Sequence, residues 1–209
     1  MDERFKGPGE LTKPVVIGIT GGISTGKSTF SDFLRGFLDA KFFDADQAAR
    51  QLVGGDAEVK ELLRQRFGTG IFSATGNLNR AALRAIVVAN EEKKRALEQI
   101  LHPRIRRQWA AAADESRKTG ELFLADIPLL YETQGEKLCD RVVVVACSPE
   151  IQQQRLRVRM QLSSSDARDM ISLQLSLTEK IRRADHVVWN NGPRDALERQ
   201  AEMLAQSWR

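Results

Sequence analysis

Gly21-Gly22-Ile23-Ser24-Thr25-Gly26-Lys27-Ser28 matches the phosphate-loop pattern G-x-x-x-x-G-K-[ST]. Glycines let such a loop wrap closely around a phosphate, and its exposed N–H groups and the following helix N-terminus attract anions. In this pattern the lysine reaches the β- and γ-phosphates, and the serine ligates Mg²⁺. The alternative is a tight glycine turn, which requires neither Lys27 nor Ser28. The stretch therefore predicts binding of a nucleoside triphosphate.

The residues on either side of the loop supply the setting that the pattern requires. Residues 15–20 form a short apolar run rich in β-branched side chains, which predicts a strand buried on both faces. Residues 27–38 place four large apolar side chains at helical spacing. The loop is thus expected between a strand and a helix.

Farther out, strands alternate with helices. Helices are predicted to open at Pro149, near Ser164 behind a Ser163-x-x-Asp166 capping box, and after Pro193. This alternation favours an α/β fold with a parallel sheet. The remaining strands are expected at residues 41–44, 122–126, 141–146 and 187–189.

A long helical segment interrupts the alternation. Residues 47–109 show almost continuous helical patterning and no obvious strand, so we interpret the segment as a helical insertion. Breaks are expected at residues 54–55, at residues 68–76 and at Pro103.

The bulk composition narrows the function classes. The 209 residues are 42% hydrophobic and 29% charged, which is typical of a globular protein of one domain with modest insertions. No apolar run reaches eighteen residues, and residues 1–13 are polar, so we expect no membrane span, no secretory signal and a cytoplasmic location. Cys139 and Cys147 lack CxxC spacing, which disfavours a zinc site.

Three acids follow predicted strands. Ligands of open α/β sheets bind at the carboxyl ends of the strands, so Asp44, Asp46 and Asp126 are expected near the phosphates. Asp44 or Asp46 would take a proton from an attacking hydroxyl, or would instead cap the helix that follows. Asp126 closes its strand as a Walker-B acid does, and its alternatives are a helix cap or a strand-end acid without metal.

Positive charge concentrates in one segment. Residues 151–183 hold seven basic and three acidic residues, an excess equal to the net charge of +4 for the whole chain. Arg155 and Arg159 share a helix face, which suits a flap that clamps phosphates, whereas Arg157 points elsewhere. A solvated helix face is the alternative. Few aromatic residues are interleaved here, which disfavours nucleic-acid binding.

Taken together, several stretches resemble the dephospho-coenzyme A kinase family. Their order and spacing match over residues 15 to about 205. The stretches are Ile19-Thr20-Gly21-Gly22-Ile23 with Gly26-Lys27-Ser28-Thr29, Asp44-Ala45-Asp46, Leu101-His102-Pro103, Asp126-Ile127-Pro128-Leu129-Leu130-Tyr131-Glu132, Asp140-Arg141-Val142, Arg155-x-x-x-Arg159 and Asn190-Asn191-Gly192.

The resemblance implies a three-layer P-loop kinase fold with a parallel sheet, a helical substrate-binding insertion and a helical lid. It implies phosphoryl transfer from ATP, with Mg²⁺, to the ribose 3′-hydroxyl of dephospho-coenzyme A. We expect a monomer or weak oligomer without nucleic-acid or membrane partners. The expected parts are a flexible or disordered extension at 1–13, a nucleotide-binding core at 14–46, 104–148 and 184–209, a coenzyme-binding insertion at 47–103, and a lid at 149–183.

The resemblance also implies roles for individual residues. Asp46, Lys27 and Arg155 would be catalytic, and Ser28 and Asp126 would hold the metal. His102 equally fits a core histidine, and Pro128 with Leu129 equally fits packing. The ATP site would comprise Gly22, Ser24, Thr25, Gly26, Lys27, Ser28, Thr29, Arg155, Arg159, Asn190, Asn191 and Gly192, of which the last three would line the adenine. The substrate site would comprise Asp44, Asp46, Arg80, His102, Pro128 and Leu129.

Two positions depart from the family pattern. Ser24-Thr25 stands where the family often has Gly-Ser, so Ser24 is expected to adopt a backbone conformation that a residue with a Cβ tolerates. Met160 follows Arg159 where the family usually has an acid, which removes any lid salt bridge from that acid.

Overall fold

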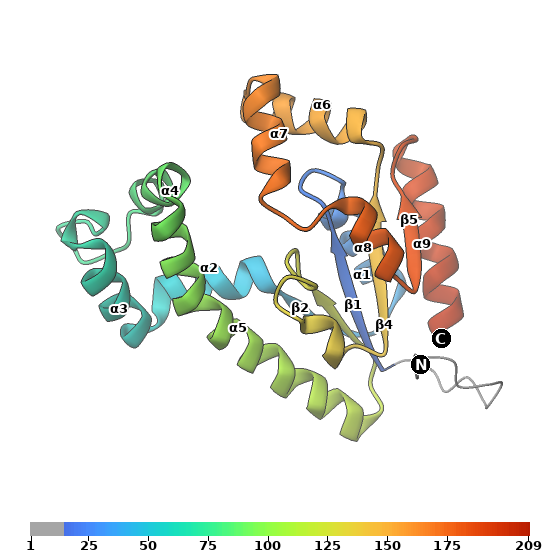
Figure 1. Cartoon of the computed structure of the whole chain (residues 1–209). Helices are drawn as coiled ribbons and strands as arrows, with labels where there is room; N and C mark the ends of the chain where they lie inside the picture. The colour runs from blue at the N-terminus through green and yellow to red at the C-terminus, as the bar shows by residue number, and fades with distance from the viewer. Residues whose placement is uncertain (1–14) are drawn as a thin grey trace, which may run out of the picture.

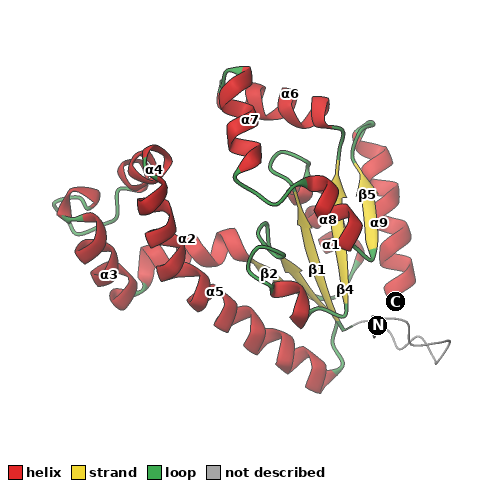
Figure 2. Ribbon diagram, viewed as in Figure 1, coloured by secondary structure: helices red, strands yellow, loops and turns green. Residues whose placement is uncertain are grey.

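The computed structural model describes residues 15–209, so the extension expected at residues 1–13 lies outside the described part. A five-stranded sheet, all of whose neighbours pair in parallel, forms the centre of the molecule (Figures 1 and 2). The strand order is β2-β3-β1-β4-β5, which confirms the predicted α/β class. The strands are β1 (Val16–Gly21), β2 (Lys41–Asp44), β3 (Phe123–Asp126), β4 (Arg141–Ala146) and β5 (His186–Trp189).

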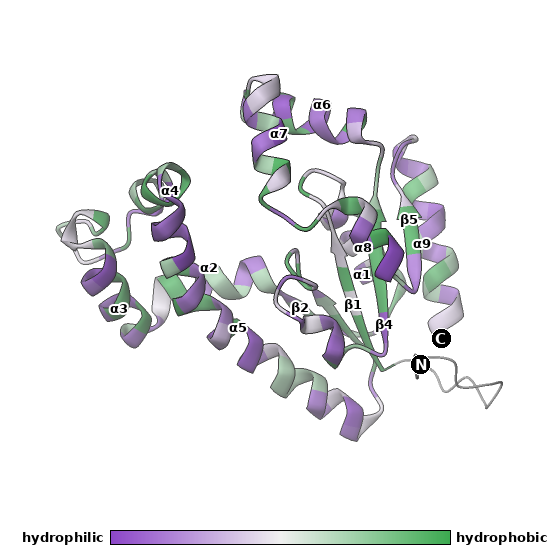
Figure 3. Cartoon of the chain, viewed as in Figure 1, coloured by the Kyte–Doolittle hydropathy of each residue, from purple (hydrophilic) through white to green (hydrophobic). Residues whose placement is uncertain are grey.

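Helices cover both faces of the sheet and make three layers. Side chains alternate across a strand, so Ile17 and Ile19 of β1 pack with α1 (Lys27–Phe37) and α9 (Arg194–Trp208) on one face. Val16 points to the other face, into a core shared with Trp109. Figure 3 shows hydrophobic residues along the strands and mostly polar ones on the outer helices. Burial on both faces explains why the inner strands β1, β3 and β4 are largely continuous apolar runs.

The order of the strands places a ligand crevice. From β1 the chain adds β2 and β3 on one side of β1, and it then adds β4 and β5 on the other side. The order in which strands are added therefore reverses at β1. In open α/β sheets ligands bind beyond the carboxyl ends of the strands at such a switch point. The phosphate loop leaves β1 at that place.

The helical insertion follows β2. The predicted breaks near residues 54–55 and 68–76 are confirmed, but the break predicted at Pro103 is wrong, because a single helix runs through it. The apolar face of that helix buries Leu101 and Ile105 on either side of the proline, and this packing offsets the lost hydrogen bond. The domain boundary at 103/104 stays a prediction and falls within this helix. The helices are α2 (Ala45–Gly55), α3 (Ala57–Phe67), α4 (Arg80–Ala89) and α5 (Glu91–Thr119), with a 3₁₀ turn, η1 (Thr69–Ile71).

The segment predicted as a lid follows β4 and contains α6 (Pro149–Met160), α7 (Ser164–Ser172) and α8 (Leu177–Arg183). The predicted capping box is confirmed, because Ser163 Oγ accepts from Asp166 N at 3.1 Å. Figure 1 shows α6 and α7 projecting beyond the phosphate loop, whereas α8 lies against the sheet. Among the described residues, no helix is both long and apolar enough to cross a membrane.

Candidate active site

The phosphate loop is tightly constrained between β1 and α1. Gly26 has a φ of 95°, and a Cβ there would collide with the Asn190 amide, so only glycine suits the position. Ser24 has a φ of 60°. This left-handed conformation is rare for a residue with a Cβ and costs about 1 kcal/mol, so Ser24 departs from the ordinary backbone expected for it. Its Oγ is buried without a hydrogen-bond partner among the described residues.

Amide side chains from distant segments support the loop from outside. Gln152 Nε2 donates to the Ile23 carbonyl at 2.9 Å, and Gln174 Oε1 accepts from Ile23 N at 3.0 Å. Asn190 Nδ2 donates to the Thr25 carbonyl at 2.8 Å. No local motif marks Gln152 or Gln174, because their contacts join segments more than a hundred residues apart. The loop is therefore held in shape by the lid segment and by the end of β5.

The predicted adenine contacts differ from what the structure places in the cleft. Asn190 supports the loop from behind, and Asn191 Oδ1 accepts from Ser148 N at 2.8 Å, at the start of the lid. Neither asparagine nor Gly192 is among the described residues that line the cleft. Their amides are engaged with backbone, so contact with adenine stays a prediction.

Lys27 and Asp126 form a buried ion pair beside the loop. Lys27 Nζ binds Asp126 Oδ1, and Ser31 Oγ donates to Asp126 Oδ2 at 2.6 Å. Asp126 is 4% exposed. Both oxygens of this strand-end acid are thus engaged by α1, which rules out a cap for a following helix. Sequence reasoning missed Ser31, although its spacing of four from Lys27 places both on one helix face.

The structure separates the roles of Asp44 and Asp46. Asp44 is the N-cap of α2, because its Oδ1 accepts from Gln47 N at 2.9 Å. Asp46 lies in the first turn and its side chain faces the cleft. Protein around Asp46 raises its carboxyl pKa by desolvation, and the positive charge of Lys27 partly opposes this rise. Asp46 is therefore the acid of the pair that a ligand can reach.

A cleft of about 1570 Å³ brings most of the predicted residues together. It lies between the phosphate loop, α5, the loop after β3, and α6 with α7. The predicted residues that line it are Gly22, Ser24, Gly26, Lys27, Ser28, Thr29, Asp46, His102, Pro128, Leu129, Arg155 and Arg159.

The two lid arginines enter this cleft from α6, whereas Arg157 does not line it. Arg155 Nη1 is buried and has no hydrogen-bond partner among residues 15–209. Arg155 also lies beside Cys147, whose thiol pKa is raised by burial and lowered in part by this arginine. The helix-face argument therefore correctly placed Arg155 and Arg159 together.

The substrate-side predictions have mixed outcomes. His102 lines the cleft, and burial lowers its pKa while Glu98 raises it in part. Arg80 is not among the described lining residues, because its Nη2 donates to the Arg50 carbonyl at 3.3 Å, so substrate binding by Arg80 stays a prediction. Sequence reasoning missed Arg84, which lines the cleft one helical turn later. Two further basic residues line the same cleft, Lys94 and Arg106.

Known proteins resemble this chain over nearly its whole length. The family model described as "Dephospho-CoA kinase" matches residues 15–195. The chain belongs to the dephospho-CoA kinase family. A curated dephospho-CoA kinase of Bacillus licheniformis is 39% identical over 195 residues, which cover 93% of this chain and 96% of that protein.

Solved structures agree with membership of the dephospho-CoA kinase family. TT1252 from Thermus thermophilus is 30% identical with a TM-score of 0.73, and the match covers 95% of this chain and all of TT1252. The dephospho-CoA kinase from Campylobacter jejuni is 25% identical with a TM-score of 0.67, covering 93% of this chain and 97% of that one. The predicted family and the predicted P-loop kinase fold are thereby confirmed.

Proposed function

We propose that the chain transfers the γ-phosphoryl group of ATP to the ribose 3′-hydroxyl of dephospho-coenzyme A, giving coenzyme A and ADP. The carrying observation is that the cleft places the phosphate-loop lysine, Lys27, and an accessible carboxylate, Asp46, on facing elements. A triphosphate held by the loop would present its terminal phosphate toward that acid. The dephospho-CoA kinase family supplies the acceptor.

Unpartnered polar atoms support a phosphate site at the loop. Ser24 Oγ and Arg155 Nη1 line the same cleft, and both are buried without partners among the described residues. Buried donors of this kind cost free energy until a ligand satisfies them, and phosphate oxygens accept strongly. In this proposal Lys27 exchanges Asp126 for phosphate oxygens when ATP binds, and Arg155 and Arg159 stabilise the charge that develops during transfer.

The residues beside the loop fit Mg²⁺. Ser28 is exposed in the cleft at the start of α1, and the Asp126 carboxylate lies next to the same helix. A hydroxyl, one or two carboxylates and substrate phosphates are the usual ligands of this ion. Ser28 and Asp126 would hold it, and the ion would neutralise charge on the phosphates.

The acceptor side is proposed to lie between α2, α5 and the loop after β3. Asp46 would orient the acceptor hydroxyl and accept its proton as transfer proceeds. Arg84, Lys94 and Arg106 provide positive charge that suits the diphosphate of dephospho-coenzyme A. Leu129 and His102 line the cleft and would contact the remainder of the dephospho-coenzyme A molecule.

An ADP-release assay tests this function directly. We expect ATP turnover with dephospho-coenzyme A and only background turnover with nucleosides or DNA. Stimulation by DNA, with none by dephospho-coenzyme A, would contradict the proposal. We also propose that the enzyme acts in the cytoplasm. We further propose that it is a monomer or weak oligomer, and analytical ultracentrifugation can test this oligomeric state.

The pH dependence of kcat/KM tests the role of Asp46. Desolvation raises the pKa of this carboxyl above its ordinary value of 3.8, and a general base works only when it is deprotonated. We therefore expect kcat/KM to fall on the acid side, with a midpoint above 3.8. The acid limb should disappear in Asp46→Asn, measured over the pH range in which both proteins stay folded. An unchanged limb would assign that titration to another group.

A further inference from the structure

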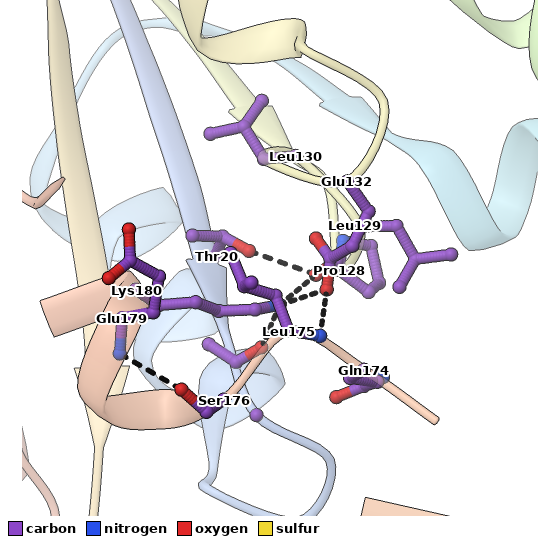
Figure 4. Close-up of polar contacts among 12 residues, drawn as sticks. Thr20, Pro128, Leu129, Leu130, Glu132, Gln174, Leu175, Ser176, Glu179 and Lys180 are labelled. Carbon is purple, nitrogen blue, oxygen red and sulfur yellow. Dashed lines mark hydrogen bonds and ion pairs between the residues drawn. The ribbon is translucent and has the colours of Figure 1, made fainter. Parts of the chain in front are cut away.

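Lys180 of α8 is a fully buried lysine that the family comparison and the proposed chemistry leave unexplained. Its side chain is 0% exposed, and its ammonium group makes three contacts (Figure 4). Nζ donates to the Gly21 carbonyl at 3.2 Å and to the Pro128 carbonyl at 3.0 Å, and it pairs with Glu132 Oε1 at 2.9 Å. All three donors of the ammonium are thus used, and none reaches the cleft.

Two of these partners belong to opposite sides of the proposed reaction. Gly21 is the first residue of the phosphate loop, which would hold the donor nucleotide. Pro128 lies in the loop after β3, where Pro128, Leu129 and Glu132 line the proposed acceptor side. Thr20 Oγ1 also donates to the Pro128 carbonyl at 2.9 Å, so a single carbonyl is held by two donors (Figure 4). We call Thr20, Pro128 and Lys180 the Pro128 clasp.

The segment between α7 and α8 is also hydrogen-bonded to the loop after β3 and to the phosphate loop. Glu132 Oε1, which pairs with Lys180, also accepts from Leu175 N at 3.0 Å, between α7 and α8. Gln174, the residue before Leu175, accepts from Ile23 N of the phosphate loop. The segment that returns from the lid is therefore bonded to both the donor loop and the acceptor loop.

Stability alone gives little reason for a buried ammonium at this position. Desolvation of a buried charge commonly cancels its favourable contacts, and an apolar side chain of similar volume often serves as well or better. An ammonium with three fixed acceptors, however, imposes one geometry on α8 and the two segments that it contacts, the end of β1 and the loop after β3. A small shift in such a geometry is costly in phosphoryl transfer, where positioning provides most of the catalysis.

We infer that Lys180 and Thr20 are positioning residues whose clasp on Pro128 fixes the acceptor loop relative to the phosphate loop. This inference rests on the proposed function, because it assigns the two loops to the two substrates. The clasp would set the distance between the transferring phosphoryl group and the acceptor hydroxyl. It would act on kcat more than on nucleotide binding, since the loop N–H groups and Lys27 remain in place.

Steady-state kinetics with Lys180→Met and Thr20→Val test the inference. Lys180→Met keeps the length of the side chain without its charge, and we expect kcat to fall roughly 10- to 100-fold. Thr20→Val is isosteric and removes one of two donors to Pro128, so a loss of about 3- to 10-fold is expected. Thr20→Ser keeps the hydroxyl, so its kcat should stay close to that of the wild type. KM for ATP should change less than kcat in both.

The matched control is Arg182→Met on the same helix. Arg182 is 72% exposed and pairs only with Glu179 in the described structure, so kcat and both KM values should stay at wild-type levels. Lys180→Met also leaves Glu132 without its cation and should lower the melting temperature. Lys180→Met with Glu132→Gln removes that charge imbalance, so the melting temperature should recover while kcat stays low.

Different results would refute the positioning role of Lys180 and Thr20 and the proposed kinase activity. Wild-type kcat in both Thr20→Val and Lys180→Met would overturn the clasp. Recovery of kcat together with the melting temperature in the double variant would make Lys180 a purely structural residue, which also overturns it. If Lys180→Met does not fold, the Thr20→Val and Thr20→Ser pair decides. Failure of the wild-type chain to phosphorylate dephospho-coenzyme A would instead refute the proposed function.

Discussion

Asp46→Asn should lower kcat by about 10²- to 10⁴-fold, the range that general base catalysis usually contributes. The reason is that Asp46 faces the cleft, whereas its neighbour Asp44 is engaged in capping α2. Asparagine keeps the shape of the side chain but cannot accept a proton from the acceptor hydroxyl. Coupled ADP-release kinetics with dephospho-coenzyme A measure the loss. Binding of ATP, followed by calorimetry, should survive the substitution.

The same substitution should not destabilise the fold. A carboxyl whose folded pKa is raised opposes folding once it is charged, so its unfavourable contribution appears as pH rises through that pKa. At neutral pH, Asp46→Asn should therefore melt at or above the wild-type temperature. The difference should close as pH falls and the wild-type carboxyl becomes protonated. Near-wild-type turnover, or a lower melting temperature at neutral pH, would make Asp46 a structural residue.

Lys27→Ala should weaken ATP binding and lower kcat/KM by about 10²- to 10³-fold, the usual effect of removing one preorganised group that stabilises transition-state charge. The physical reason is that Lys27 belongs to the phosphate loop itself and, in our proposal, exchanges its present partner Asp126 for phosphate oxygens when ATP binds. Titration calorimetry with ATP and steady-state kinetics measure the two effects.

Lys41→Ala provides the control for Lys27→Ala. Lys41 begins β2 and forms an exposed ion pair with Glu121, with 47% of its side chain accessible. Exposed pairs contribute little, so this variant should bind ATP and turn over as the wild type does. Normal kinetics in Lys27→Ala would refute the assignment of residues 21–28 as the phosphate site. Because Asp126 loses its partner, the folded state of Lys27→Ala should be checked by its melting curve.

The centre of the sheet was largely predictable because β1, β3 and β4 are buried on both faces. Runs of β-branched residues identified β4 with the boundaries found in the structure and β1 with a shift of one residue, and the short stretch Lys41–Asp44 matched β2. The loop pattern then located the crevice, since its position follows from chain order. The family resemblance, rather than any local pattern, supplied the acceptor.

The failures of prediction have a common physical cause. Pro103 has a strong local preference to end a helix, yet buried contacts on both sides carry α5 through it. α8 is an exception, because it was missed although Ser176-x-x-Glu179 is a local helix-start pattern of the kind recognised at Ser163. The Pro128 clasp was not predicted because its contacts join residues 52 and 108 positions apart. Local patterns report preferences, whereas these features depend on packing between distant segments.

The uninterrupted course of α5 has a mechanical consequence. A helix of 29 residues is about 43 Å long at 1.5 Å per residue, and this one joins the side of the sheet to the tip of the insertion. Such a helix behaves as a lever, so a tilt of about 5° at the sheet would displace its far end by about 4 Å over that length. Because residues of α5 from Lys94 to Trp109 line the cleft, such a tilt would change the width of the cleft.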